Sequence, residues 1–364
     1  MRIGVPREVK SNETRVALTA EAVKELTDAG HQVAIQVGAG ASAGIPDADF
    51  AAVGAQLVPD AASAWGADLV LKVKEPQPSE FDLLSDSILF TFLHLAANEP
   101  LATALCKAGT TAISYDTVQT DDGALPILTP MSAIAGAVGA LEGAHHLLSP
   151  YGGRGLLLAG APGVPPARVV VIGAGVAGTA ALERVIDAGA DAVVMDIATD
   201  RLAALEERFG DAVTTVESTP QAVGEQVAQA DVVIGAVLVP GRPAPVVVTH
   251  AMIESMKPGS VLVDIAIDQG GCVEDSRPTT HRDPVFEVSG SQLYCVANMP
   301  AAVGSTATQA LVHASLPYVK GLADHGAAAL DADPVLMRGL NADAGKIRNR
   351  AVHEAFPHLP ADLA

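Results

Sequence analysis

Three glycines and an aspartate in the middle of the chain have the spacing of a dinucleotide-binding turn. The apolar run 169–172 leads into glycines in G-x-G-x-x-G spacing, Gly173, Gly175 and Gly178. A helical pattern follows, and a second apolar run ends at Asp196. Such glycines permit a tight turn, close approach of backbone N–H groups to a pyrophosphate, and close packing of helix on strand. The helix N-terminus then favours the negative charge of the phosphates.

The position of Asp196 indicates which dinucleotide would bind. A carboxylate at the end of the second strand can accept hydrogen bonds from both ribose hydroxyls of NAD, whereas it repels the 2′-phosphate of NADP. The sequence therefore predicts NAD as the cofactor. The alternative is a glycine-rich turn in another kind of α/β protein, which the complete strand–turn–helix–strand context disfavours.

A second group of reactive side chains lies in the first third of the chain. Lys74, His94 and Asp116 each follow an apolar run, and Arg15 lies in the loop after the first run. Because ligands of open α/β sheets bind beyond the carboxyl ends of the strands, these side chains are expected at one edge. An arginine, a lysine and a histidine together suit a small anionic substrate.

Each of these residues also has a purely structural interpretation. Arg15 could be a surface or interface arginine, and Lys74 could be a solvated lysine at a strand end. His94, in the apolar run FLHLAA, could be a core histidine.

Alternating strands and helices must position these groups. Strands are predicted at 2–5, 32–37, 68–73, 88–93, 110–115, 169–172, 231–237, 260–267 and 293–296, with another ending at residue 196. Thr19 and Asn98 are good helix N-caps, and Gly30 ends the first helix. The alternation predicts an α/β fold with two doubly wound domains built on mostly parallel sheets.

The predicted domains are discontinuous in sequence. Residues 1–130 and 306–364 are expected to form a substrate domain, and residues 131–305 a Rossmann domain that binds NAD. A linking helix over 131–148 enters the second domain, and a helix is predicted over 307–323. The last forty residues are alanine-rich and polar, and their pattern predicts no definite packing.

Composition excludes several classes of partner. The 364 residues are 49% apolar and 18% charged, which suits layers buried on both faces, and the net charge of −20 comes with no basic run. Nucleic acid and anionic membranes are therefore not expected as partners. The longest charge-free stretch, 123–141, contains two prolines, so we interpret it as a turn and a small-residue helix rather than a membrane span.

The N-terminus and the cysteines favour a cytoplasmic protein. The opening MRIGVPREVK is charged and is broken by a proline, unlike a signal peptide. Three scattered cysteines are too few for a disulfide framework or a metal cluster. His325 beside Asp324 provides too few ligands for a metal site, so none is expected.

Taken together, the motifs resemble the bacterial NAD-dependent alanine dehydrogenases. These belong to a wider family with the NAD-binding subunit of proton-translocating transhydrogenase and the lysine-forming saccharopine dehydrogenases. The matching stretches cover nearly the whole chain: RIGVPREVKSNETRVALT, LVLKVKEP, ILFTFLHLAA, YDTVQT, VVVIGAGVAG, VIGAVLVPG, VLVDIAIDQGGC and YCVANMPAAV. The resemblance implies reversible oxidative deamination of L-alanine to pyruvate and ammonium, and a homohexamer.

The resemblance also assigns roles to residues. It implies that Arg15 and Lys74 bind the substrate and that His94 and Asp268 are catalytic, although Asp268 could merely cap the loop before Gly270. Besides the glycines, the implied cofactor contacts are Ser132, Asp196, Arg201, Ser218, Val237, Leu238, Ile265, Ala266, Ile267, Asp268, Arg277, Val296, Ala297, Asn298 and Met299. Arg201 stands where a lysine is common, which preserves the charge.

The sequence departs from the family pattern at three positions. Asp116 replaces a glutamate that usually follows the tyrosine, and Ala133 and Ala137 stand where charged residues are frequent. The first change affects a contact near the expected site, and the other two weaken polar contacts at the domain link or a subunit interface. Two other functions stay open: an NAD(H)-binding transhydrogenase-type subunit without amino-acid chemistry, and a non-catalytic NAD-binding regulator.

Overall fold

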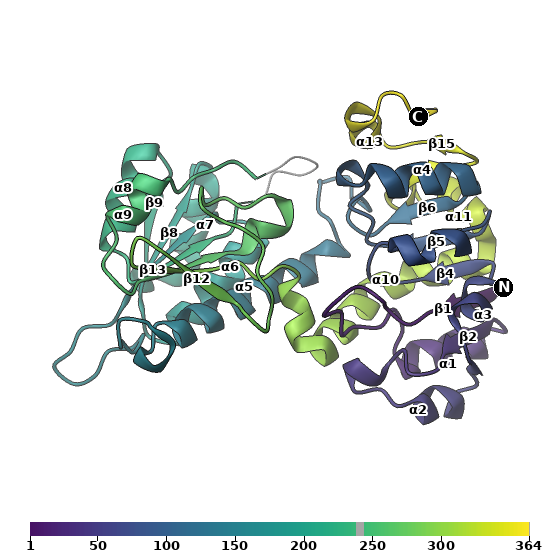
Figure 1. The fold of residues 1–364 in the computed structure, drawn as a ribbon, viewed down its shortest axis with the longest axis horizontal. Coiled ribbons are helices and arrows are strands. Elements are labelled where there is room, and N and C mark those ends of the chain that lie inside the picture. Colours follow the sequence, from purple (N-terminus) through teal and green to yellow (C-terminus); the bar gives the residue numbers. More distant parts are fainter. Residues whose placement is uncertain (238–243, 364) are drawn as a thin grey trace. The chain divides into compact units, whose positions relative to one another are not determined.

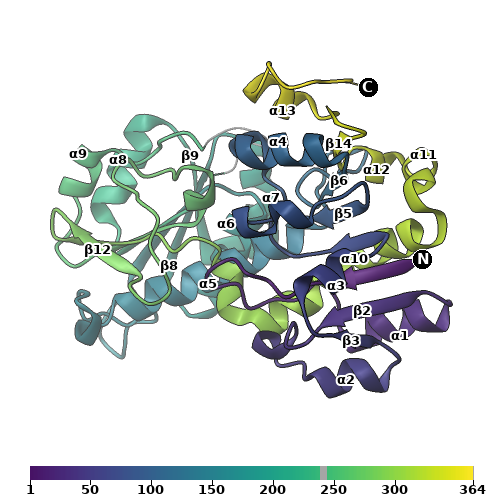
Figure 2. The ribbon, with the colours of Figure 1, turned by 45° about the vertical axis from the view of Figure 1, so that its right-hand side comes forward.

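The computed structural model describes residues 1–237 and 244–363, and the chain divides into two compact units (Figure 1). The first unit consists of Met1–Met131 and Val303–Ala364, and the second of Ser132–Ala302. Each unit is an α/β sheet structure with helices on both faces of its sheet, which confirms the predicted fold class (Figures 1 and 2).

The first unit contains an eight-stranded sheet in the order β15-β14-β6-β5-β4-β1-β2-β3. Its strands are β1 (Arg2–Val5), β2 (Gln32–Gln36), β3 (Gln56–Val58), β4 (Leu69–Leu71), β5 (Ile88–Thr91), β6 (Thr111–Ser114), β14 (Leu340–Asp343) and β15 (Lys346–Ile347). β1 to β6 pair in parallel, whereas β14 is antiparallel to β6 and to β15.

Both helix caps that the sequence predicts are present in the first unit. Thr19 accepts a hydrogen bond from the amide of Ala22 at the start of α1, and Asn98 accepts one from Leu101 at the start of α4. The helices are α1 (Ala20–Asp28), α2 (Asp47–Ala52), α3 (Ala61–Trp65), α4 (Glu99–Ala108), α10 (Gly304–His325), α11 (Ala329–Ala332), α12 (Pro334–Met337) and α13 (Arg350–Ala355). Four 3-10 turns lie between them: η1 (Ala41–Ala43), η2 (Pro78–Leu83), η3 (Leu95–Ala97) and η8 (Gly326–Ala328).

The C-terminal segment completes the core of the first unit. Ala342, Ile347 and Val352 are buried in one cluster with Trp65 and Leu89 from the N-terminal segment. The sequence analysis did not predict β14 and β15, because strands of four and two residues are too short to show an alternating pattern. The turn between them has two successive residues with positive φ, as type I′ hairpins require.

The second unit contains a seven-stranded sheet in the order β12-β13-β11-β10-β7-β8-β9. Its strands are β7 (Arg168–Ile172), β8 (Asp191–Asp196), β9 (Val213–Glu217), β10 (Val232–Gly235), β11 (Val261–Asp264), β12 (Val285–Val288) and β13 (Ser291–Tyr294). All neighbours are parallel except β12, which is antiparallel to β13.

Helices cover both faces of this second sheet. They are α6 (Val176–Asp187), α7 (Thr199–Phe209), α8 (Pro220–Gln229) and α9 (His250–Glu254), together with α5 (Leu128–His146), which enters from the first unit. Three 3-10 turns, η4 (Ser149–Tyr151), η5 (Gly210–Ala212) and η7 (Met299–Val303), lie between elements. The linking helix begins three residues earlier and ends two residues earlier than predicted.

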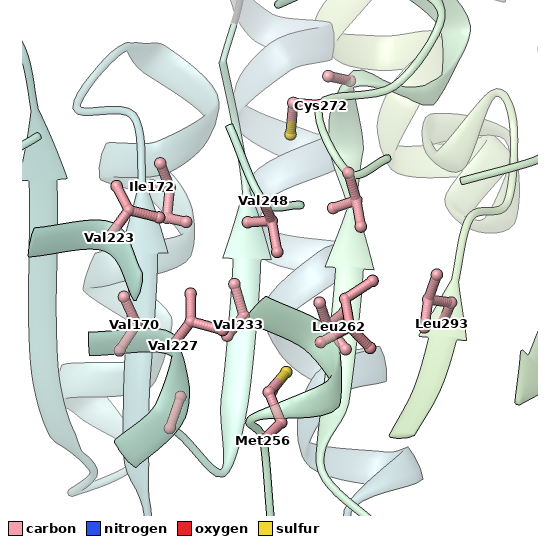
Figure 3. Close-up of a cluster of buried hydrophobic side chains, with 14 of the residues drawn as sticks. Val170, Ile172, Val223, Val227, Val233, Val248, Met256, Leu262, Cys272 and Leu293 are labelled. Carbon is pink, nitrogen blue, oxygen red and sulfur yellow. The ribbon is translucent and has the colours of Figure 1, made fainter. Parts of the chain in front are cut away.

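Successive side chains along each strand point to opposite faces of the sheet, and helices bury both faces. Val233 of β10 belongs to the cluster that α8 and α9 cover, with Val227 and Leu262 beside it (Figure 3). Its neighbour Val232 points to the opposite face, where it lies against Gly143 of α5. Because both faces are buried, these strands are continuous apolar runs that the sequence analysis could recognise.

Several predicted strands extend beyond the strands of the structure, and the run 260–267 extends furthest. The run 260–267 was expected to be extended throughout, but β11 ends at Asp264 and residues Ile265–Gln269 form the 3-10 turn η6. The carboxylate of Asp264 accepts a hydrogen bond from the amide of Ala266 at 3.0 Å, and this cap starts the turn. Apolar residues continue past the strand because Ala266 and Ile267 are buried in the turn.

In the part of the chain that the structure describes, no helix is long and apolar enough to cross a membrane.

Candidate functional site

The glycine turn of the second unit joins β7 to α6. Gly173 has a φ of +107°, and a Cβ atom there would lie 2.6 Å from the carbonyl oxygen of Ala236. At Gly178 a Cβ atom would lie 1.7 Å from the carbonyl oxygen of Gly173. A side chain fits at neither position, so both glycines are required by the turn and by the packing of helix on strand.

The start of α6 is open to a ligand. Gly175 is the N-cap of this twelve-residue helix, and a Cβ atom at Gly175 would have no neighbour within 4 Å. The helix therefore begins with exposed backbone amides and the positive end of its dipole. This geometry fits the pyrophosphate of a dinucleotide.

Asp196 ends β8 beside the glycine turn, and its carboxylate is 8% exposed. One oxygen accepts a hydrogen bond from the amide of Ala174 at 2.6 Å, and the other accepts one from Ala198 at 2.8 Å. Arg201 on α7 approaches the same carboxylate at 3.9 Å. The acid thus fixes the turn and also carries the charge expected at the ribose position.

Ser218 follows β9, and its amide donates a hydrogen bond to the backbone carbonyl of Asp196 at 2.9 Å. The structure therefore places Ser218, Asp196 and the glycine turn along the carboxyl ends of three neighbouring strands. Their order β9-β8-β7 is the one that the dinucleotide fold uses beside its switch point.

Asp268 lies in the turn η6 and is exposed. Both of its carboxylate oxygens accept the backbone amide of Asn298, at 3.2 and 3.1 Å. Asn298 has a φ of +61°, a conformation that asparagine tolerates better than most residues. The amide of Gly270 donates to the carbonyl of Ile267, so the carboxylate of Asp268 binds the backbone at Asn298 rather than at Gly270.

Asp264 organises the loop that carries Asp268. Its carboxylate is 1% exposed and accepts hydrogen bonds from four N–H and O–H donors at 2.6–3.2 Å: Ala266, Cys272, Val273 and Ser276. The thiol of Cys272 lies 3.4 Å from one oxygen, and burial together with this carboxylate raises the pKa of the thiol. Asp264 was not among the predicted site residues.

The remaining predicted cofactor contacts lie in several places in the second unit. Ser132 is half-buried on α5, and Val237 packs on the strand core after β10. Ile265 is half-buried in η6, and Val296, Ala297 and Met299 follow β13, with Val296 and Met299 buried. Arg277 lies over the ring of Phe286, 4.1 Å from its centroid. Leu238 lies outside the residues that the structure describes.

In the first unit, Arg15 is buried and paired. Its Nε and Nη2 atoms donate to the two carboxylate oxygens of Glu13 at 2.7 and 2.6 Å, and Nη1 lies 3.2 Å from the sulfur of Met131. The side chains of Arg15 and Glu13 are 2% and 0% exposed. The interpretation of Arg15 as a surface arginine is therefore wrong.

Lys74 follows β4 and is also buried, at 6% exposure, so it is not a solvated strand-end lysine. Its backbone is held on both sides. The carbonyl accepts from the hydroxyl of Thr91 at 3.0 Å, and the amide donates to Glu8 at 3.4 Å. Glu8 also accepts the amide of Val73 at 2.6 Å and therefore fastens the loop after β1 to the end of β4.

A buried ion cluster supports this strand end. The ammonium group of Lys72 lies 3.0 Å from Glu8 and 3.1 Å from Glu80. Burial alone would lower the pKa of Lys72, but the attraction of the two carboxylates outweighs it and raises that pKa. Burial also raises the pKa of Glu8, against the attraction of Lys72.

His94 follows β5 and is not a core histidine, because its side chain is 42% exposed. Its backbone is left-handed, with φ 45° and ψ 40°, and its ring stacks on Phe92 with an interplanar angle of 7°. Nδ1 lies 3.6 Å from a carboxylate oxygen of Asp116. The ring is thus oriented yet accessible, as a group that exchanges protons with a substrate must be.

A cavity of about 410 Å³ opens beside Arg15. Glu8, Glu13, Arg7 and Arg15 from the loop after β1 line it on one side, and residues that follow β2 close the other. Lys74 and His94 are not among its lining residues. A second cavity of about 390 Å³ lies at the amino ends of β8 and β9, at the opposite end of these strands from Asp196.

Sequence reasoning missed the acidic partners in the first unit. Glu13 stands two residues from Arg15, and Glu8 and Glu80 flank Lys72 only in the fold. An excess of positive charge was expected at this edge, but buried acids pair with the bases there. The available signal was the alternation of charge in REVKSNETR.

In residues 1–237 and 244–363, the structure contains no group of three or more histidine, cysteine or acidic side chains that could hold a metal ion.

Comparison with known proteins assigns a family to nearly all of this chain. The N-terminal domain model of the alanine dehydrogenase/PNT family matches residues 4–135, and its C-terminal domain model matches residues 139–350. An alanine dehydrogenase of Mycobacterium tuberculosis is 53% identical, over 97% of this chain and 96% of its own length.

Solved structures support membership of the same family. A structure of L-alanine dehydrogenase superposes with a TM-score of 0.95 at 49% identity, covering 98% of this chain and 99% of that one. A transhydrogenase from Sinorhizobium meliloti superposes with a TM-score of 0.81 at 26% identity, covering 96% of this chain and all of the other.

Proposed function

Because the chain belongs to the alanine dehydrogenase/PNT family, we propose that it is an NAD-dependent amino-acid dehydrogenase that converts L-alanine, water and NAD reversibly to pyruvate, ammonium, NADH and a proton. The observation that carries this proposal is the full-length match to alanine dehydrogenases, together with an accessible histidine and two buried bases at one sheet edge of the first unit.

The second unit would hold the cofactor. Backbone amides at Gly175 would bind the pyrophosphate, and Asp196 would accept the ribose hydroxyls. The carboxylate of Asp196 also selects NAD over NADP by charge. When bound, NAD accepts the hydride that leaves the α-carbon of the amino acid.

The first unit would hold the substrate. Glu13 holds the guanidinium of Arg15, which would bind the substrate carboxylate. The ammonium group of Lys74 would stabilise the negative charge that develops on the carbonyl oxygen of pyruvate. Glu13 keeps the guanidinium of Arg15 in place, which reduces the entropy lost on binding.

Proton transfer would fall to His94 and Asp268. Hydride leaves from a neutral amine, so a proton is first removed from the ammonium group of alanine. Water then adds to the imine carbon, and ammonia leaves after protonation. His94 would take and return these protons, and Asp268 would orient the attacking water or the amine.

The alternative is a transhydrogenase-type subunit that binds NAD(H) without amino-acid chemistry. The similarity to the Sinorhizobium meliloti transhydrogenase, at 26% identity, supports the shared fold. The higher identity to alanine dehydrogenases over the full chain favours the enzyme. A non-catalytic NAD-binding regulator is disfavoured, because it has no use for an exposed histidine, a buried arginine and a buried lysine that follow neighbouring parallel strands.

The NADH absorbance band provides the test. Purified protein with L-alanine and NAD should generate NADH, and pyruvate, ammonium and NADH should consume it. D-alanine and NADP are the controls and should give little signal. Tight binding of NAD with no turnover in either direction would contradict the proposed activity and favour the transhydrogenase-type alternative. Glyoxylate in place of pyruvate would measure the breadth of specificity.

We further propose a cytoplasmic homohexamer. The family resemblance supports the assembly, and the three unpaired cysteines support a reducing compartment. Sedimentation velocity should give the mass of six chains of 36.9 kDa, and a monomer at micromolar concentration would refute the assembly.

A further inference from the structure

The loop around Arg15 is tied together by the carboxylate of Glu13. One oxygen accepts the backbone amides of Thr14 and Arg15 at 3.1 and 2.9 Å, and both oxygens bind the guanidinium of Arg15. These contacts fix the conformation of the loop. They do not fix where the loop lies in the first unit, because all of their donors and acceptors belong to residues 13–15.

The start of α10 provides contacts that do fix its place. The hydroxyl of Thr308 accepts a hydrogen bond from the amide of Val16 at 3.2 Å, although 292 residues separate the two. One turn earlier, a Cβ atom at Gly304 would lie 2.9 Å from the backbone oxygen of Thr14. The helix therefore contacts the loop on both sides of Arg15, and the loop after β1 runs beside the start of α10 in both views (Figures 1 and 2).

The contact with Thr308 satisfies a buried group. Val16 is 1% exposed and lies outside the helices and strands, so its amide needs an acceptor from elsewhere in the fold. Thr308 is 0% exposed, and the helix that carries it has 22 residues and is packed through Leu311 and Val319. The loop is thus fastened to a rigid support.

We propose that Gly304 and Thr308 are positioning residues for Arg15, an inference that rests on the proposed function of Arg15 in binding the substrate carboxylate. Gly304 has no side chain, which lets the start of α10 approach the residue before Arg15. Thr308 anchors the residue after it. Neither residue is expected to touch the substrate, so both act through the place of the guanidinium.

Thr308→Val tests this role. Valine has nearly the same shape but no hydroxyl, so the buried amide of Val16 loses its acceptor, and the loop with Arg15 shifts. A group that binds the carboxylate equally in the ground state and the transition state affects KM rather than kcat. We expect KM for L-alanine and for pyruvate to rise about tenfold, while kcat and Kd for NAD change less than about threefold.

Three controls separate this role from a general loss of structure. Ammonium has no carboxylate, so its KM at saturating pyruvate should stay within about twofold in Thr308→Val. Thr308→Ser keeps a hydroxyl and should recover most of the affinity for pyruvate. Ser315→Ala removes another buried hydroxyl of α10, one that binds no backbone amide among the described residues, and should leave both KM values unchanged.

Gly304→Ala tests the other contact and decides the matter if Thr308→Val fails to fold. Its methyl group must displace Thr14, so KM for L-alanine should rise at least about threefold. Gly321→Ala is the control on the same helix, because a Cβ atom there has no neighbour within 4 Å, and it should leave KM unchanged.

The outcomes distinguish this inference from the proposed function. Equal KM for L-alanine in Thr308→Val and Ser315→Ala would overturn the inference, as would a fall in kcat with KM unchanged. If Thr308→Val does not fold, equal KM in Gly304→Ala and Gly321→Ala would overturn it. Absence of turnover in the wild type would instead refute the proposed function, and the inference with it.

Discussion

The parallel strands of the two sheets have the same order, but the chemistry at their switch points differs. In both sheets the six parallel strands follow the order 3-2-1-4-5-6, and an antiparallel strand, β14 in the first sheet and β12 in the second, lies beside the sixth. The first strands, β1 and β7, occupy equivalent central positions. The segments that leave these two strands differ completely.

After β7, only Gly173, Ala174 and Gly175 precede α6, and the turn offers backbone amides with Asp196 beside them. After β1, residues 6–19 precede α1, and this longer loop carries Glu8, Glu13 and Arg15 in buried pairs. The comparison teaches that one topology provides two kinds of site. A short glycine turn binds phosphate, and a long charged loop holds fixed side-chain ions.

The largest expected effect tests whether the strand ends of the first unit and the glycine turn of the second unit act separately. His94→Ala removes the accessible imidazole of the first unit and should lower kcat about 10²- to 10⁴-fold. Kd for NAD should stay within about twofold, because the glycine turn lies in the other unit. Steady-state assays measure kcat, and fluorescence titration with NADH measures the binding of the dinucleotide. Equal loss of turnover and NAD binding would contradict the proposed role.

The next prediction breaks the glycine turn. Gly178→Ala places a methyl group against the carbonyl of Gly173, and overpacking of this kind costs about 1–3 kcal/mol. NAD affinity should fall by a similar free energy, about ten- to a hundredfold. Trp65, the single tryptophan, is buried in the first unit, so its fluorescence should stay unchanged.

Gly321→Ala is the matched control for that change. Gly321 also lies in a helix, but a Cβ atom there has no neighbour within 4 Å. The substitution should therefore stabilise α10 by roughly 0.5–1 kcal/mol. If Gly178→Ala and Gly321→Ala behave alike in thermal unfolding and NAD binding, the steric explanation of the turn is wrong.

Asp264→Asn tests the loop that carries Asp268. The variant replaces one carboxylate oxygen, which accepts hydrogen bonds, with an NH₂ group that faces the same donors. A buried donor is then left unsatisfied, at a cost of about 1–2 kcal/mol. Because Asp268 lies in the same loop, kcat should fall about tenfold. Asp283→Asn, at an exposed aspartate of the same unit, should have no effect on kcat.

The smallest expected effect is on the pH dependence of the protein's stability, through Glu8 in the loop after β1. Burial raises the pKa of Glu8, against the attraction of Lys72, so the folded protein binds this proton more tightly than the unfolded chain does. Wild-type stability should therefore fall as pH rises from the ordinary glutamate range through the raised pKa. Glu8→Gln lacks this ionisation, so its stability relative to wild type should increase over that interval.

Urea unfolding followed by Trp65 fluorescence at several pH values measures this difference. Glu21→Gln, at an exposed position on α1, provides the control and should run parallel to wild type. A constant difference between Glu8→Gln and wild type at all pH values would show that Glu8 does not titrate in this way.

Much of the fold could be predicted because burial leaves a pattern. The parallel strands are covered on both faces and appear as apolar runs, and caps such as Thr19 and Asn98 mark helix starts locally. The end of β11 could not be predicted in the same way. Ala266 and Ile267 remain apolar and buried beyond it, so hydrophobicity gives no sign that the strand has ended.

The candidate site was predicted as single residues rather than as pairs. Arg15 and His94 were recognised by type and position, and the structure shows that one is buried and the other accessible. Asp116 was expected at the same sheet edge as His94, because each follows a predicted strand. The acidic partner of Arg15, Glu13, is fixed by loop geometry, about which a periodic pattern carries no information. Asp264 escaped notice because a strand-end aspartate looks the same whether it binds a ligand or its own loop.

The return of the C-terminal segment to the first sheet affects how the chain matures on the ribosome. β14 pairs with β6, although more than two hundred residues separate them, and the inserted unit, Ser132–Ala302, leaves the exit tunnel before β14 does. The middle of the protein can thus fold while synthesis continues, whereas the N-terminal sheet keeps an uncovered edge at β6 until translation is nearly complete. Loss of the final thirty residues would leave that edge exposed permanently.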